Sequence, residues 1–163
     1  VDAMNETAAG LGMAQSRFVD PMGLSVDNVS TAADLALLVR ASYSRPAIGE
    51  LSTTRAFTVD FRQPRYRLGF GNTNPLTQSS RWNVRLTKTG YLTEAGRCLT
   101  MVADVEGRPH AMVFLNSFGK RSPLGDAGRA KRWLESGTVG SIAPAARRHE
   151  RQTLVDLGLE TDG

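Results

Sequence analysis

Cysteine and histidine are scarce in this chain of 163 residues. Cys98 is the only cysteine, which excludes a disulfide within the chain and any cysteine-rich metal site. Because Cys98 lies in an apolar run, we expect a buried structural thiol. His110 and His149 are the only histidines, and no Cys, Asp or Glu cluster accompanies either at ligand spacing. We therefore expect no metal centre and no cofactor.

Long apolar runs are also missing. No run approaches the ~20 residues that a helix needs to span a bilayer. The hydrophobic content of 40% and charged content of 22% are typical of a soluble globular protein. The chain opens at Val1 with neither an initiator Met nor a signal peptide, which fits a mature domain or a fragment.

The formal charge of +4 is unevenly placed along the chain. Residues 1–80 carry seven Lys/Arg against seven Asp/Glu, whereas residues 81–163 carry thirteen against nine. A basic C-terminal half favours an anionic partner. Its basic residues are not interleaved with stacking aromatics, so we do not expect a nucleic-acid partner. A carboxylate-rich polymer fits, and so does a solvated basic face with no specific ligand.

Apolar periodicity predicts an α+β fold, in which helices cover an antiparallel sheet. The last predicted strand, 111–115, is apolar on both faces, as a central strand would be, and it lacks a neighbour. The chain thus indicates strands that would precede it. The predicted elements are helices over 2–9, 31–43 (capped by Ser30), 46–50 and 122–135, strands over 81–87, 98–103 and 111–115, an ordered turn over 18–25, a hairpin turn at 106–109, a strand or extended arm over 52–60, a polar loop over 69–76 and a polar tail after 137.

The most informative motif is Lys88-Thr89-Gly90, which follows the predicted strand over 81–87. K-T-G after a strand is one of three signatures of the serine acyl-enzymes that bind penicillin. Lys88 would supply a fixed positive charge, and Thr89 would donate a charge-assisted hydrogen bond to a substrate carboxylate. Gly90 would let an extended peptide approach the strand backbone. The alternative is an ordinary surface turn after a strand.

A nucleophile motif is absent from the place where catalysis needs it. Ser117-Phe118-Gly119-Lys120 matches S-x-x-K, but a nucleophilic Ser must begin a helix so that the Lys one turn later reaches its hydroxyl. Here a strand precedes Ser117, a Gly intervenes, and the match follows K-T-G instead of preceding it. We therefore reject Ser117 as the nucleophile.

Further segments accompany K-T-G and resemble one family in order and spacing. They are 18–25 (Phe-Val-Asp-Pro-Met-Gly-Leu-Ser), 28–32 (Asn-Val-Ser-Thr-Ala), 51–55 (Leu-Ser-Thr-Thr-Arg), 72–74 (Asn-Thr-Asn), 86–90 (Leu-Thr-Lys-Thr-Gly), 95–99 (Ala-Gly-Arg-Cys-Leu) and 118–120 (Phe-Gly-Lys). Together they resemble the periplasmic D-alanyl-D-alanine endopeptidases, which are low-molecular-mass penicillin-binding proteins. The resemblance covers residues 1 to about 137, and we expect 138–163 to be a polar C-terminal tail.

This resemblance implies a β-lactamase/transpeptidase-like fold with a five-stranded antiparallel sheet, covering helices and a helical lobe, of which three core strands lie here. It implies serine-type hydrolysis of D-Ala to diaminopimelate cross-links in peptidoglycan through an acyl-enzyme that β-lactams trap. Lys88, Thr89 and Gly90 would bind substrate, and the backbone N–H of Tyr91 would serve the oxyanion hole. The family's S-x-x-K and S-x-N motifs match nothing in this chain, so we expect a C-terminal fragment that is inactive alone.

Two alternatives remain. One is a D-alanyl-D-alanine carboxypeptidase of the same fold, although such enzymes often end in an amphipathic membrane helix and residues 145–163 show no strong amphipathic pattern. The other is a truncated, non-catalytic module that binds wall peptides. We expect a periplasmic protein without a stable membrane anchor.

Overall fold

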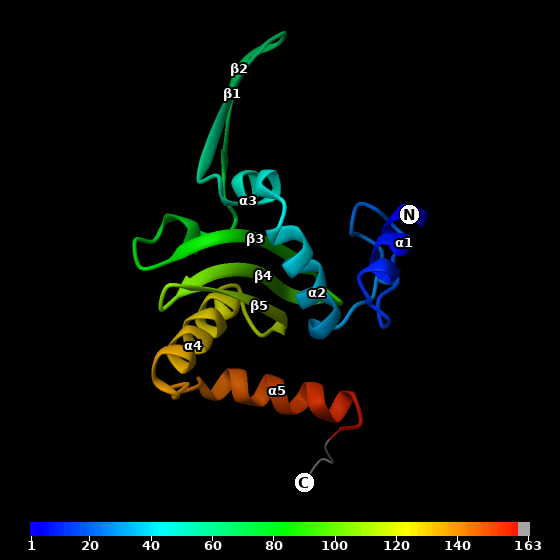
Figure 1. Cartoon of the computed structure of the whole chain (residues 1–163), viewed down its shortest axis with the longest axis vertical. Coiled ribbons are helices and arrows are strands. Elements are labelled where there is room, and N and C mark those ends of the chain that lie inside the picture. Colours follow the sequence, from blue (N-terminus) through cyan, green and yellow to red (C-terminus); the bar gives the residue numbers. More distant parts are fainter. Residues whose placement is uncertain (160–163) are drawn as a thin grey trace.

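A three-stranded antiparallel sheet forms the centre of the computed structural model, which describes residues 1–159 (Figure 1). The strand order is β3-β4-β5, and β5 forms one edge of this sheet. The three predicted core strands and the α+β class are thus confirmed. The strands are β3 (Asn83–Leu92), β4 (Gly96–Val105) and β5 (Arg108–Ser117).

The turn between β4 and β5 lies where the sequence predicts it. Glu106 and Gly107 both have positive φ angles, 49° and 75°, and they join the paired residues Val105 and Arg108. Two successive residues in this left-handed region are typical of the tightest hairpin turns, whose twist matches that of the strands. This short loop sets the register of β5 against β4.

The central strand β4 is buried on both faces. Leu99 and Met101 point to one face, which packs under Ala127 of helix α4 (Ser122–Ser136). Val102 points to the other face and packs against Val39 of helix α2 (Ala32–Tyr43). Since side chains alternate along a strand, one apolar strand supplies the core beneath a helix on either side.

Residues 1–31 form helix α1 (Asp2–Gly10) and an ordered loop that is tied to α2. The capping residue of α2 is Thr31, whose hydroxyl accepts from Asp34 N at 3.2 Å, and the predicted cap at Ser30 is wrong. The Ser30 hydroxyl instead lies 2.7 Å from that of Ser16. Asp34 is buried and accepts from the Ser16 hydroxyl at 2.7 Å. The Ser30 hydroxyl thus contacts the loop, and the Thr31 hydroxyl caps the helix.

The strand alternative predicted within 52–60 is confirmed from Ala56 onward, and this strand forms a long two-stranded ribbon with part of the predicted loop. Helix α3 (Pro46–Thr53) is longer than predicted, and β1 (Ala56–Arg62) pairs with β2 (Arg65–Gly71). Residues 69–71 therefore belong to a strand and not to a loop. Their Gly-Phe-Gly composition is typical of a loop, but Phe70 pairs across the ribbon with Phe57. A short 3-10 helix, η1 (Pro75–Gln78), then leads to β3.

The predicted polar tail contains a helix, α5 (Pro144–Asp156). Its start carries the one local signal that the sequence offers, a Pro in the first turn, where the missing N–H costs nothing. The division into a domain over 1–137 and a tail over 138–163 remains a prediction, and residues 160–163 of that tail lie outside the described residues.

Asp20 organises the predicted turn after Phe18. Its carboxylate accepts hydrogen bonds from the backbone N–H groups of Met22 at 3.0 Å, Leu24 at 2.6 Å and Ser25 at 3.2 Å. The N–H donors of Met22 and Leu24 lower the pKa of Asp20 from its ordinary value of 3.8, because they favour the charged form. The turn holds Met22 and Leu24 with their side chains largely exposed.

Replacing Met101, which is fully buried, with Ala should lower the free energy of unfolding by about 2–5 kcal/mol, because a cavity remains under α4. Met22 is 77% exposed and provides a matched control, since Met22→Ala should change stability by less than about 0.5 kcal/mol. Chemical denaturation of both variants checks the comparison. Equal losses would contradict the assignment of the core to β4.

The Asp20 turn should open in acid. Because its folded-state pKa is lowered, the ionised carboxylate stabilises the turn above the ordinary Asp pKa of 3.8, and this contribution is lost as the pH falls through the lower folded pKa. An NMR titration of the Asp20 carboxyl carbon measures the pKa directly, and Asp20→Asn should remove the pH dependence of the turn's amide signals. A pKa at or above 3.8 would disprove the hydrogen-bonded geometry.

Candidate functional site

Lys88, Thr89 and Gly90 lie inside β3 and not in a turn. Lys88 pairs with Thr100 of β4, and Gly90 pairs with Cys98. The turn begins only after Leu92. The alternative of a surface turn is therefore wrong, and the strand continues through the motif because Thr89 and Gly90 keep the regular pairing with β4.

The outer edge of β3 presents backbone groups of alternate residues. The Thr87 N–H donates to the Ser52 hydroxyl at 3.2 Å, and Ser52 belongs to α3, outside the sheet. In an antiparallel strand the N–H groups of every second residue point to the same edge. The N–H groups of Thr89 and Tyr91 therefore point to this outer edge too. This orientation is the one that the predicted oxyanion donor at Tyr91 requires.

The Asn-Thr-Asn segment over 72–74 supports β3 from this outer side. Asn74 is fully buried, and its amide donates to the Thr87 hydroxyl at 2.9 Å. The Thr73 hydroxyl lies 2.6 Å from the Thr89 hydroxyl. If Thr89 donates to a carboxylate, Thr73 is placed to donate to Thr89, so that the two hydroxyls form a directed chain.

Two cavities meet at Lys88 and Thr89. A cavity of about 360 Å³ extends toward the base of the β1–β2 ribbon and is lined by Phe57 and Phe70. A second cavity of about 720 Å³ is lined by Met22 and Leu24 of the Asp20 turn. Lys88 and Thr89 border both cavities, so a long substrate could pass over them from one to the other.

The larger cavity is strongly basic. Its cationic lining residues are Lys88, Arg97, Lys120 and Arg121, and no acidic side chain lines it among the described residues. The Lys88 ammonium donates to the Thr89 carbonyl oxygen. The Arg97 guanidinium lies 4.3 Å from the centre of the Tyr91 ring, in a cation–π contact. Such a cavity favours a ligand that carries carboxylates.

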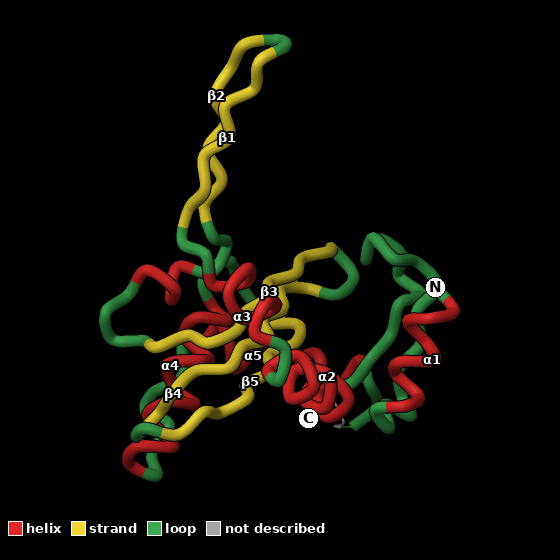
Figure 2. The backbone as a smooth tube through the Cα atoms, turned by 45° about the horizontal axis from the view of Figure 1, so that its top comes forward, coloured by secondary structure: helices red, strands yellow, loops and turns green. Residues whose placement is uncertain are grey.

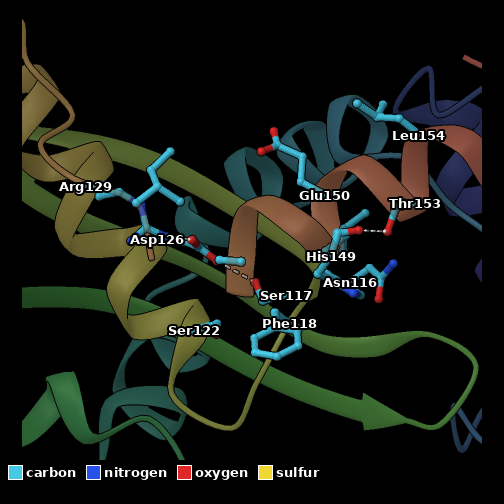
Figure 3. Close-up of a pocket in the computed structure, with 13 residues that line it drawn as sticks. Asn116, Ser117, Phe118, Ser122, Asp126, Arg129, His149, Glu150, Thr153 and Leu154 are labelled. Carbon is cyan, nitrogen blue, oxygen red and sulfur yellow. Dashed lines mark hydrogen bonds and ion pairs between the residues drawn. The ribbon is translucent and has the colours of Figure 1, made fainter. Parts of the chain in front are cut away.

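Ser117 lies in a different environment from Lys120. Its hydroxyl donates to Asp126 at 2.7 Å, in a cavity of about 330 Å³ between β5, α4 and α5 (Figure 3). His149 borders the same cavity, but its ring donates to the Asn116 carbonyl at 3.1 Å and not to Ser117. Lys120 lines the basic cavity instead. The pair Ser117 and Lys120 thus lacks the geometry of a nucleophile and its base.

Several site residues escaped the sequence analysis. Thr73 and Arg97 appear there only as members of resembling segments, and Lys120 appears there also as the lysine of the rejected S-x-x-K match, so nothing local assigns them to the site. Cys98 also lines the basic cavity and is half-buried, so the expected full burial is wrong. Among residues 1–159, no group of three His, Cys, Asp or Glu side chains could hold a metal ion, and none of the helices is long and apolar enough to cross a membrane.

Comparisons with known proteins identify the family of this chain. The family model described as D-alanyl-D-alanine carboxypeptidase matches residues 1–119. The chain is 47% identical over 159 residues to a D-alanyl-D-alanine endopeptidase of Pseudomonas aeruginosa and 46% identical over 157 residues to one of Escherichia coli. These matches cover 98% and 96% of this chain but 51% of each relative, so the chain spans about half the length of these curated relatives.

Solved structures share the fold. Penicillin-binding protein D2 of Listeria monocytogenes, in its cefotaxime-bound form, matches 83% of this chain and 53% of its own with a TM-score of 0.66 and 29% identity. A DD-transpeptidase of Streptomyces matches 77% of this chain and 49% of its own with a TM-score of 0.67 and 26% identity. Because the family model matches residues 1–119, which include Lys88, Thr89 and Gly90, the chain belongs to the D-alanyl-D-alanine carboxypeptidase family of serine peptidases.

Proposed function

We propose that this chain supplies the substrate-binding side of a serine-type D-alanyl-D-alanine endopeptidase that hydrolyses D-Ala to diaminopimelate cross-links of peptidoglycan. The observation that carries the proposal is the basic cavity at β3, where Lys88 and the Thr89 hydroxyl meet an outward-pointing Tyr91 N–H. A cross-link contains a carboxylate next to the scissile amide, which suits this arrangement.

Each residue has a distinct role in the proposed reaction. Lys88 and Thr89 hold the substrate carboxylate by charge and hydrogen bonding. Gly90 has no side chain, and a Cβ there would meet only Cys98 at 3.9 Å, so the β3 backbone stays open to an extended peptide. The Tyr91 N–H donates to the oxyanion that forms when the acyl carbon becomes tetrahedral.

The nucleophile and its base come from residues outside this chain in our proposal. The attacking Ser would form an ester with the D-alanyl carbonyl carbon and release the diaminopimelate amine, and water would then hydrolyse the ester. β-Lactams would acylate the same Ser. The relatives with 46% and 47% identity are named endopeptidases, which supports cross-link cleavage over the carboxypeptidase reaction. Because peptidoglycan is the proposed substrate, we propose that the protein acts in the periplasm.

The 163-residue chain alone should not react covalently with a fluorescent penicillin. Ser117 is the only described serine three residues before a lysine, and its hydroxyl donates to Asp126 outside the cavity that contains Lys88 and Lys120. The full-length gene product that contains the chain should form one acyl adduct per molecule. Intact-mass analysis of both samples measures the adducts. A stoichiometric adduct on the isolated chain would overturn the exclusion of Ser117.

In that full-length protein, Lys88→Ala should slow acylation by substrate and by β-lactams roughly 10- to 100-fold, because a charge-assisted contact to the carboxylate is lost. Lys88→Arg should recover only part of the rate, since a planar guanidinium replaces a compact ammonium. Lys131 lies on α4 outside both cavities, so Lys131→Ala is the matched lysine control. Unchanged acylation in Lys88→Ala would refute the role of this motif.

A further inference from the structure

The β1–β2 ribbon has one apolar and one polar face. Side chains alternate along each strand, so cross-strand partners share a face. The pairs on the apolar face are Phe57 with Phe70, Val59 with Leu68, and Phe61 with Tyr66. The opposite face carries Thr58 with Gly69, Asp60 with Arg67, and Arg62 with Arg65. The ribbon therefore has the pattern of a sheet with one covered face.

No described element covers that apolar face. Both views show the ribbon standing away from the body of the molecule (Figures 1 and 2). Phe57 is 64% exposed and Phe70 is 51% exposed, and Val59 is the only ribbon residue in β1 or β2 that is even half-buried. Because a lone two-stranded ribbon is marginally stable in water, a ligand on the apolar face would also stabilise the ribbon.

The free end of the ribbon combines aromatic rings with positive charge. Phe61 and Tyr66 stack with their centres 4.4 Å apart and their planes 6° apart. Arg67 pairs with Asp60 at 2.6 Å, whereas Arg62 and Arg65 form no ion pair among the described residues. The end of the ribbon is thus complementary to a ligand that has both carboxylates and flat apolar surfaces.

The base of the ribbon is continuous with the candidate site. Phe57 and Phe70 line the same cavity of about 360 Å³ as Lys88 and Thr89. At ~3.3 Å per residue, the strands extend the surface by roughly 17 Å beyond that cavity. A ligand held at Lys88 can therefore continue along the apolar face, provided that it is a polymer.

We propose that the apolar face of the β1–β2 ribbon binds the peptidoglycan polymer next to the cross-link that Lys88 and Thr89 hold. Pyranose rings present flat faces of C–H groups, which pack on the electron-rich faces of aromatic rings. Carboxylates of neighbouring stem peptides bind Arg62 and Arg65. This assignment rests on the proposed function and adds to it a preference for polymeric over small substrates.

Two other occupants fit the ribbon less well. A second copy packed on the apolar face would leave Arg62 and Arg65, which lie on the opposite face, without an acidic partner. A bilayer surface favours arginines that flank an inserted apolar face, whereas Arg67, Arg62 and Arg65 lie on the face opposite to the aromatic rings. Only the polymer occupies the apolar face and the arginines while it also reaches Lys88.

The test is cosedimentation of the 163-residue chain with purified insoluble peptidoglycan, which needs no nucleophile. Phe61→Ser combined with Tyr66→Ser should weaken binding roughly tenfold, as expected for the loss of two aromatic contacts. Phe61→Leu with Tyr66→Leu keeps the apolar face but not the rings, and it should also weaken binding. Arg62→Gln with Arg65→Gln should weaken binding roughly two- to fivefold at low salt and less at high salt.

Matched controls come from α5 and the residues after it. Leu157→Ser with Leu159→Ser removes two exposed apolar side chains, and Arg147→Gln with Arg148→Gln removes two exposed charges. Both controls should bind like the unaltered chain. Circular dichroism spectra of every variant confirm that the helices and the central sheet persist, and sedimentation without polymer corrects for self-association.

The proposal would be overturned if the ribbon variants bound peptidoglycan as well as the controls, or if the unaltered chain did not bind it. It would also be overturned if the chain bound vesicles of anionic phospholipid more strongly than peptidoglycan, or if the ribbon variants altered only the oligomeric state. The ribbon variants should leave β-lactam acylation of the full-length protein unchanged. Normal acylation together with unaltered polymer binding would refute the ribbon proposal alone, whereas a failure of acylation in the unaltered protein would refute the proposed reaction.

Discussion

The pairing of β3 with β4 is the constraint on which the candidate site depends. β4 is anchored because Met101 packs under α4 on one face and Val102 packs against α2 on the other. A shift of β3 by one residue would move each of its side chains to the opposite face of the sheet. Leu86 would then leave the core beneath α2, and Lys88 would point away from the basic cavity. The packing of apolar side chains thus places a charged one.

The outer edge of β3 needs a second kind of support, because an edge strand has backbone groups without partners in the sheet. Ser52 accepts the Thr87 N–H, and the buried Asn74 amide binds the Thr87 hydroxyl. Both contacts hold the edge at Thr87, one residue before Lys88. The edge from Thr89 onward stays open, which is where the proposed peptide would lie. Because the backbone and side chain of Thr87 already have hydrogen-bond partners, a ligand can bind only to the part of the edge that follows.

Charge and shape around Lys88 are divided between two cavities that differ in character. The larger one is lined by Arg97, Lys120 and Arg121 together with residues of the Asp20 turn, whereas the smaller one is lined by the aromatic residues Phe57 and Phe70. The carboxylate of a small peptide would need only the larger, basic cavity. The smaller cavity extends the site from the cations near the end of β5 to the ribbon, and a polymer can contact the whole length of this site.

Local sequence patterns determined the elements and the family of this protein. The strand before K-T-G, the Glu106-Gly107 turn and the α4 helix follow from apolar periodicity and turn chemistry, which act between near neighbours. Phe70 lies in a strand only because Phe57 pairs with it, and α5 begins at a Pro in a polar stretch with little periodicity. Lys120 joins Lys88 only because β4 and β5 return the chain to the same end of the sheet. Such contacts between distant residues depend on how the sheet and helices pack, and only the tertiary structure decided them.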